Sequence, residues 1–181
     1  MKITDNSHQF GLVSILLHWI LAVLIIGLFV IGNILEDMPR GPDKGQLMGL
    51  HQSIGMLVLA LVLLRLIWRL RQGFPSPVNP DAKRLNHIAK LWHWALLVII
   101  LAIPVTGYLS ADAGPRAVAF FSWFNWPDLI EPARDLRKQF GGLHGALNKI
   151  MIPLVLIHIL AAFKHHFWDR DTTLKRMLGK S

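Results

Sequence analysis

Four long apolar stretches constrain the fold of this chain more than any other feature of its sequence. They lie near residues 12–33, 49–70, 88–110 and 145–167. Each is long enough to cross a hydrocarbon core of about 30 Å, which takes roughly 20 helical residues. The hydrophobic share of 53% and the mean hydropathy of +0.44 support this interpretation. The sequence therefore predicts an all-α fold, an integral membrane four-helix bundle that forms one domain over residues 1–181.

The basic residues are divided unevenly between the two sides of such a bundle. With four crossings, both termini and the second connection share one side, and an excess of Lys and Arg beside the spans marks the cytoplasm. The other side has seven basic and seven acidic residues. We therefore expect both termini in the cytoplasm and, since topology explains the net charge of +8, no nucleic-acid partner. The expected cytoplasmic side holds twelve of the nineteen basic residues: Lys2, Arg65, Arg69, Arg71, Lys83, Arg84, Lys90, Lys164, Arg170, Lys175, Arg176 and Lys180.

The connections between the stretches are polar or rich in proline. Residues 34–48 and 111–143 are predicted as outer connections, and residues 71–87 as an extended inner linker. The longer outer connection contains an aromatic segment, which we expect to lie on the membrane surface as a helix or loop, with a partner-docking surface as the alternative. Its aromatic residues are Phe120, Phe121, Trp123, Phe124 and Trp126.

The absence of cysteine restricts the kinds of redox or metal site that the chain can form. Disulfides, iron–sulfur clusters, thiolate zinc sites and covalent c-type haem attachment all require cysteine, so all four are excluded. Histidine is then the residue type that most deserves inspection as a ligand.

Four of the nine histidines stand out by their positions along the apolar stretches: His18, His51, His144 and His158. His144 and His158 are fourteen residues apart, which in a helix means about 21 Å along the axis and nearly the same face. By depth, His51 corresponds to His144 near the outer side, and His18 corresponds to His158 near the cytoplasmic side. A single intramembrane histidine is usually satisfied by a neighbouring helix, but two facing pairs indicate a binding function.

Two facing imidazoles suit a haem better than a bare metal ion. Zinc or copper recruits further ligands, yet the four stretches contain no Asp or Glu. A porphyrin supplies four nitrogens itself and leaves two axial positions for a histidine pair. Glycines near these histidines either clear space for a macrocycle or allow close helix packing. They are Gly55, Gly141, Gly142 and Gly145.

Arg65 follows His51 by fourteen residues and therefore lies on the same helix face near the inner end. We predict that it either bonds a haem propionate or extends to the cytoplasmic interface. For Arg69 we expect only the extension to the interface.

The sequence resembles the prokaryotic cytochrome b561 family over nearly its whole length. The family's His-Trp pair early in the first span is matched by His18-Trp19, and its motif "LHxSxG" at the start of the second span by "LHQSIG". The second span ends in "LLRLIWR", the fourth carries His144 and His158, and the segment "KHHFWDRDTTLKRM" follows. Each motif is weak alone, but their order and spacing together are specific.

The resemblance implies two b-type haems, the inner with axial ligands His18 and His158 and the outer with His51 and His144. It also implies a multi-pass protein of the bacterial inner membrane that exchanges electrons with ubiquinone. One branch of the family is similar to a superoxide:ubiquinone oxidoreductase, so an oxidoreductase or electron carrier is expected, with superoxide or an unidentified donor on the periplasmic side.

Other functions remain open alongside this one. A haem b membrane-anchor subunit of a hydrogenase or dehydrogenase would share the same haem sites, whereas a histidine-lined metal or solute transporter would be colourless. The outer connections are neutral overall, although Arg134, Arg137 and Lys138 form a local basic cluster that would attract an anion.

Three further histidines lie toward the cytoplasmic side. His93 is the strongest rival to His18 as the partner of His158. Together with His165 and His166, it is also a candidate for a quinone site, because an imidazole with a pKa of about 6.5 can exchange protons as quinone is reduced.

Overall fold

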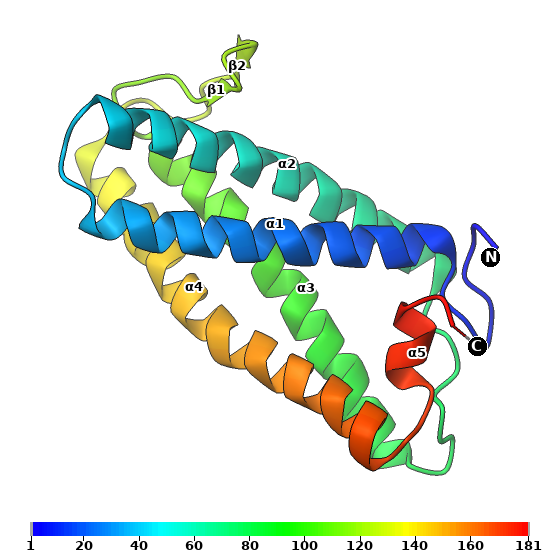
Figure 1. Ribbon diagram of the computed structural model, residues 1–181. Coiled ribbons are helices and arrows are strands. Elements are labelled where there is room, and N and C mark those ends of the chain that lie inside the picture. Colours follow the sequence, from blue (N-terminus) through cyan, green and yellow to red (C-terminus); the bar gives the residue numbers. More distant parts are fainter. Residues whose placement is uncertain (1, 181) are drawn as a thin grey trace.

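The computed structural model describes residues 2–180 and is mainly helical (Figure 1). Four long helices make up most of the chain, and two antiparallel strands form a small hairpin between the third and fourth helices. The described ends of the chain lie at the same end of the helices. We call this the inner end and the opposite one the outer end. The elements are α1 (Leu12–Asp37), α2 (Pro42–Gln72), α3 (Lys83–Asp112), β1 (Ala119–Phe120), β2 (Phe124–Asn125), α4 (Arg134–Phe163), the π-helix η1 (Lys164–Trp168) and α5 (Thr173–Met177).

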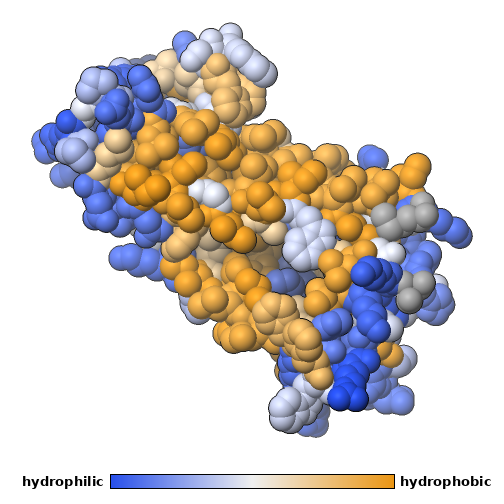
Figure 2. Space-filling view, in the orientation of Figure 1, coloured by the Kyte–Doolittle hydropathy of each residue, from blue (hydrophilic) through white to orange (hydrophobic). Residues whose placement is uncertain are grey.

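Helices α1 to α4, with η1 continuing α4, are long and apolar enough to cross a membrane, which confirms the predicted fold class. Their outward faces carry large apolar side chains, and Val23, Val98 and Leu160 are each more than 60% exposed. Figure 2 shows an apolar band between polar ends on the face that it displays. Lipid hydrocarbon can cover such a band, so exposure to the surroundings of the bundle has no hydrophobic cost in a bilayer.

The helices extend beyond the predicted apolar stretches, so the predicted connections are too long. Residues 34–37 belong to the end of α1 and residues 42–48 to the start of α2, which leaves only residues 38–41 between them. The predicted connections 71–87 and 111–143 shrink in the same way to 73–82 and 113–133. Hydropathy detects only the part of a helix inside the hydrocarbon, whereas α2 starts where Pro42 supplies a favourable first helical residue.

The aromatic segment of the outer connection forms the hairpin β1–β2, with Phe120 opposite Phe124. It is therefore not a helix. Phe121 and Ser122 at its turn have positive φ, as tight turns require. The backbone N–H of Phe121 donates a hydrogen bond to the hydroxyl of Ser53 on α2, at 2.9 Å. The hairpin consequently lies against the outer part of α2, at Ser53, which follows His51 by two residues.

The four long helices pack in an open row. Helix α4 packs on α3, α3 on α2, and α2 on α1, whereas α4 makes little direct contact with α1 or α2. The centre of the core is formed by Leu21, Val58 and Val62 from α1 and α2. Met151 is the buried residue of α4, at 5% exposure. Helix α4 therefore packs mainly against α3.

The terminal segments of the described chain fold back over the inner end. The indole N–H of Trp19 on α1 donates to the carbonyl of Met177 on α5 at 2.8 Å. Arg176 donates to the carbonyl of Ser76 in the inner connection, also at 2.8 Å. Helix α5 also contacts η1 and α4. These contacts tie the last short helix to both α1 and α4.

Candidate functional site

The outer histidine pair joins α2 to α4. The ring centroids of His51 and His144 lie 6.3 Å apart, and the ring planes are nearly perpendicular, at 82°. Nδ1 of His144 lies 2.9 Å from the carbonyl oxygen of Ile103 on α3. Because a carbonyl only accepts, Nδ1 must carry the proton, which leaves Nε2 with a free lone pair. Nδ1 of His51 is buried without a hydrogen-bond partner among the described residues.

Gly107 on α3 leaves room for the ring of His144, a role that the sequence did not reveal. A Cβ atom at Gly107 would lie 3.0 Å from two atoms of the His144 ring, closer than side chains normally approach. The glycine therefore allows the ring to lie against α3 and reach the Ile103 carbonyl. The available signal was a glycine in the third apolar stretch at the same depth as His144.

The four glycines singled out in the sequence divide into two groups. A Cβ at Gly141 would lie 3.1 Å from the hydroxyl of Ser110, so this glycine permits close packing of α4 on α3. At Gly55, Gly142 and Gly145 a Cβ would meet no described atom within 4 Å. Close helix packing does not explain these three, and the open space beside them is compatible with a flat ligand.

The inner end brings together three histidines and one arginine. The ring centroids of His18 and His158 are 6.1 Å apart, at an interplanar angle of 72°. His93 lies even closer to His158, at 5.4 Å. Its Nδ1 donates to the carbonyl of Ala89 at 2.6 Å, which fixes the ring against its own helix. Nη2 of Arg65 is 3.4 Å from Nδ1 of His18.

Both pairs fit a metal held between two imidazoles. With metal–nitrogen bonds of about 2 Å, two imidazoles on opposite sides of one metal have ring centroids roughly 6.2 Å apart. The separations in the pairs His18–His158 and His51–His144 are 6.1 and 6.3 Å. Each pair joins α4 to a helix on which it does not pack, and Figure 2 shows the surface recessed between the apolar ridges of α1 and α4. The arrangement can therefore accept a planar group that supplies the remaining ligands.

Arg65 and Arg69 differ in their surroundings, and Arg69 departs from its expected role. Arg69 does not extend to the interface: it is 9% exposed, its Nη1 lies 3.5 Å from the Asp5 carboxylate, and its guanidinium stacks over Phe10 and Phe74. The expectation for Arg69 is wrong because a folded-back N-terminal segment supplies an internal anion. Arg65 has no such carboxylate, and its Nη1 is buried without a partner among the described residues.

Apolar residues separate the two histidine pairs. Val58 lies seven residues after His51 on α2, and Met151 lies midway between His144 and His158 on α4. Seven residues are close to two helical turns, so each apolar residue shares a face with the histidines of its helix. Val58 and Met151 are 2% and 5% exposed. The structure thus has two polar sites divided by a buried apolar layer.

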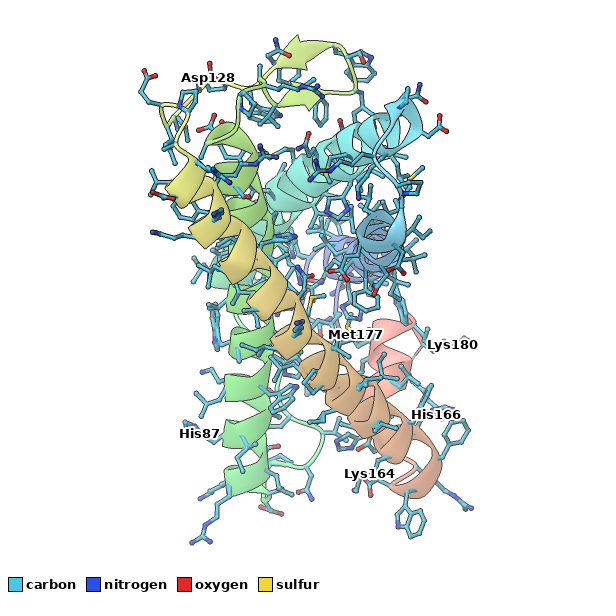
Figure 3. All side chains as sticks on the ribbon, turned by 90° about the vertical axis from the view of Figure 1, so that its left-hand side faces the viewer. His87, Asp128, Lys164, His166, Met177 and Lys180 are labelled. Atoms are coloured by element: carbon cyan, nitrogen blue, oxygen red, sulfur yellow. The ribbon has the colours of Figure 1, made fainter. Side chains whose placement is uncertain are left out.

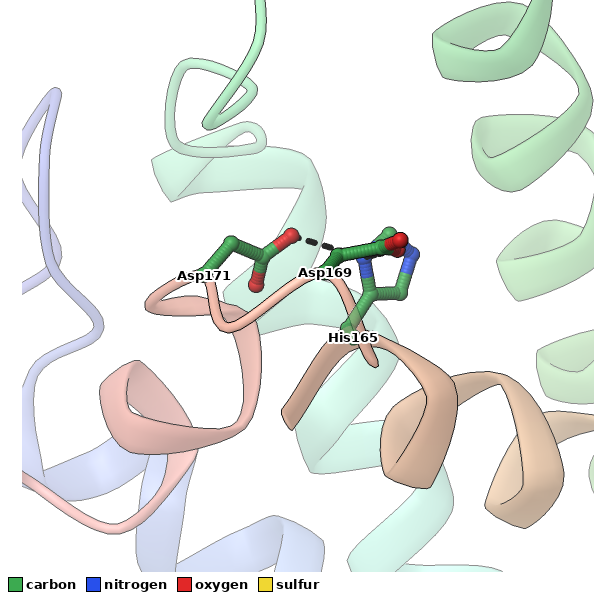
Figure 4. A group of neighbouring side chains, drawn as sticks. All are labelled: His165, Asp169 and Asp171. Carbon is green, nitrogen blue, oxygen red and sulfur yellow. Dashed lines mark hydrogen bonds and ion pairs between the residues drawn. The ribbon is translucent and has the colours of Figure 1, made fainter. Parts of the chain in front are cut away.

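His165 and His166 lie on η1, where the fourth helix ends. Nδ1 of His165 is 2.7 Å from the Asp171 carboxylate and 3.2 Å from that of Asp169 (Figure 4). Lys164 already bonds both Asp169 oxygens, and the Thr173 N–H bonds Asp171, so this cluster is satisfied without a metal. Burial alone would raise the pKa of Asp171, but the hydrogen bonds from Thr173 and His165 lower it below its ordinary value.

The three candidate quinone residues occupy two different places. His93 lies beside His158, whereas His165 bonds its carboxylates and His166 has a buried Nδ1 without a partner among the described residues. Figure 3 shows His87 at the inner end of α3, apart from His166 on η1. His87 is exposed.

Known proteins are similar to this chain over nearly its whole length. The sequence profile of the prokaryotic cytochrome b561 family matches residues 9–180. Cytochrome b561 homolog 2 of Escherichia coli is 31% identical, with 100% of this chain and 97% of the relative aligned. Cytochrome b561 homolog 1 of the same organism is 27% identical over 96% of this chain and 98% of its own. Probable superoxide oxidase CybB of Yersinia pestis is 25% identical over 95% and 97%, respectively.

Proposed function

Since the chain belongs to the prokaryotic cytochrome b561 family, we propose that it carries single electrons across the bilayer through two b-type haems and exchanges them with ubiquinone. The family gives the general function, which is membrane electron transfer by a bacterial integral membrane protein with haem b. The number of haems, their ligands, the quinone and the inner-membrane location belong to the proposal.

The observation that carries the proposal is the geometry of the two histidine pairs. In it, His51 and His144 would hold the outer haem, and His18 and His158 would hold the inner haem. A haem held by two histidines would supply one-electron redox chemistry. The ring separations of 6.1 and 6.3 Å leave room for one metal in each pair.

The chain's other residues set the electrostatics of the inner site. The guanidinium of Arg65, buried in part and lacking a carboxylate, would bond a propionate of the inner haem. Val58 and Met151 would keep water out of the region between the sites. With fourteen residues between His144 and His158, the two sites are about 21 Å apart along α4, so the edges of two large macrocycles would be much closer.

The proposed electron donor on the periplasmic side is superoxide. A relative named probable superoxide oxidase aligns over most of this chain, which favours this donor without excluding a protein donor. Arg134, Arg137 and Lys138 at the start of α4 would attract an anion to the outer end. Ubiquinone would be reduced at the inner end, where His93, His165 and His166 are the candidates for proton exchange.

Spectroscopy of the purified protein tests the proposal. A pyridine haemochrome assay should give two haems per chain, and a reduced-minus-oxidised spectrum should show an α-band. His158→Ala should remove the inner haem and leave the outer one, so the ratio falls from two to one. Colourless protein, or retention of both haems by this variant, would contradict the assignment.

A second measurement separates an independent oxidoreductase from an anchor subunit. The isolated protein in liposomes should reduce a short-chain ubiquinone when superoxide is generated outside. A haem-loaded protein that reduces quinone only in a stable complex with a hydrogenase or dehydrogenase would instead support the anchor function.

A further inference from the structure

The carbonyl oxygen of Ile103 on α3 receives more than one hydrogen-bond donor. Nδ1 of His144, on the neighbouring helix α4, lies 2.9 Å from it. The side-chain oxygen of Thr106 also lies 2.9 Å from it. In an α-helix the backbone N–H four residues later, here that of Gly107, points at the same oxygen. Because a carbonyl oxygen has two lone pairs, these donors compete for one acceptor.

Thr106 is buried, at 6% exposure, in the middle of this arrangement. Its side-chain oxygen lies 2.9 Å from the carbonyl oxygens of both Ala102 and Ile103. A hydroxyl group has a single hydrogen, so that hydrogen is shared between the two carbonyls. Threonines within helices commonly bond a carbonyl of the preceding turn, and the bond to Ala102 alone would satisfy this hydroxyl. The second contact is distinctive because its acceptor already serves His144.

The bond from Nδ1 of His144 affects the other nitrogen of the same ring. When an imidazole donates from one nitrogen to a carbonyl, the nitrogen that binds a metal becomes more basic. A more basic ligand stabilises oxidised iron, and hydrogen bonds around the ligands are one means by which a protein sets the potential of a haem. A second donor on the Ile103 carbonyl weakens it as an acceptor for His144. The bond from the ring then becomes weaker, and the potential becomes higher.

We propose that Thr106 is a positioning residue that sets the reduction potential of the outer haem by sharing the Ile103 carbonyl with His144. The inference rests on the proposed function, in which His51 and His144 hold that haem. Thr106 is not itself a ligand. It acts through the carbonyl of Ile103 and the ring of His144, and it keeps the outer potential above the value that His144 alone on this carbonyl would give.

The effect should be confined to the outer site. His158 is fourteen residues after His144, which places it about 21 Å along α4. The polar neighbours of the inner site are also different: Arg65 lies beside His18, and His93 bonds the carbonyl of its own helix. A change at Thr106 therefore moves one potential, whereas a general change in helix packing would affect both sites.

Redox titration of the α-band in the purified, haem-loaded protein tests this role. Thr106→Val keeps the branched shape of the side chain but removes the hydroxyl, so the bond from His144 should strengthen. We expect the outer haem to bind its electron about threefold more weakly or beyond, a fall of about 30 mV or more for a one-electron couple. The inner potential should not move. Thr106→Ser restores a hydroxyl and should restore the potential of the parent.

The matched control is Ser110→Ala, which removes a hydroxyl from the outer part of the same helix. That hydroxyl donates to the carbonyl of Arg137 at 3.1 Å, not to Ile103. Both potentials should stay at the values of the parent, and Tm and haem content are measured for each variant. The expected haem content is two per chain throughout.

Four results would overturn the role of Thr106: an unchanged outer potential in Thr106→Val, an equal shift in Ser110→Ala, a shift that Thr106→Ser does not reverse, or loss of the outer haem from Thr106→Val. The last would show that the hydroxyl is needed for binding and does not tune the potential. A parent protein without an outer haem would instead refute the haem assignment, and this inference with it. The haem assay on the parent therefore distinguishes the two failures.

Discussion

The outer and inner histidine sites differ in how many histidines lie close to the histidine of α4. At the outer site His51 is the one described histidine that faces His144, whose ring lies against Gly107 with Nδ1 bonded to the Ile103 carbonyl. At the inner site both His18 and His93 lie near His158, and Arg65 adds a positive charge. At the outer site, packing fixes the ring of His144. At the inner site, His158 has two neighbouring histidines.

The ring separations support His18 as the proposed partner of His158. The His18–His158 separation of 6.1 Å suits a metal between two rings, whereas the His93–His158 separation of 5.4 Å is shorter than two metal–nitrogen bonds require. The hydrogen bond from His93 to Ala89 also holds its ring on its own helix. Proximity alone is therefore a poor guide to ligation, and the separation of the rings is the better criterion.

The largest expected effect separates His18 from His93. His18→Ala should lower the haem content from two per chain to one, because His158 loses its only partner at a suitable distance. His93→Ala should keep both haems. Pyridine haemochrome assays on the two purified variants check this. Loss of a haem in His93→Ala together with full occupancy in His18→Ala would reverse the assignment of the inner site.

A smaller effect is expected from crowding the outer site. Gly107→Ala places a methyl group 3.0 Å from the His144 ring, and overpacking of this kind costs about 1–3 kcal/mol. We expect reduced occupancy of the outer haem with the inner haem intact, as shown by redox titration of the α-band. Gly27→Ala is the control, since a Cβ there meets no described atom within 4 Å. Equal losses in the two variants would show that the effect is a general one on the helices.

Removing the charge at the inner site should change a potential without removing a haem. Arg65→Leu takes away a cation that favours the reduced form, so the inner potential should fall on the order of 50 mV, or about 1 kcal/mol for a one-electron couple. The outer potential should not move, and Arg71→Leu, which alters an exposed arginine on the same helix, should move neither. A shift in the potential of the outer haem alone would contradict the placement of Arg65 beside the inner haem.

The smallest effect concerns Asp171, which bonds His165 on η1 and Thr173 at the start of α5. Because the folded state lowers the pKa of Asp171, its contribution to stability is present above its ordinary pKa of 3.8 and is lost as the pH falls through the lower folded value. Asp171→Asn should therefore lower Tm at neutral pH, and the difference from the parent should shrink below pH 3.8. A difference that grew in acid would have the wrong sign for this mechanism. Thermal unfolding at several pH values measures it.

Much of the membrane architecture could be read from the sequence, but the helix ends could not. Hydropathy located all four spans because the hydrocarbon core demands about 20 apolar residues in a row. Hydropathy does not detect polar helix ends. The sequence therefore predicts a connection at residues 34–37 and 42–48, which belong to α1 and α2. The hairpin β1–β2 was missed for a similar reason: two-residue strands carry almost no periodic pattern.

The candidate site shows the same division. Spacing and depth were enough to predict that His51 would face His144 and His18 would face His158, because a helix advances by a fixed rise and rotation per residue. The role of Gly107 and the burial of Arg69 against Asp5 depend on segments distant in sequence. No local pattern encodes such contacts.

The sequence by itself determined that this chain has four helices long and apolar enough to cross a membrane, with histidines at two depths. Both follow from local properties, namely the length of an apolar run and the geometry of a helix. Only the tertiary structure decided the ring separations at the inner site, the placement of Gly107 behind His144, and the pairing of Arg69 with Asp5. These depend on how the helices pack and on where the terminal segments fold back, and packing is a property of the whole chain.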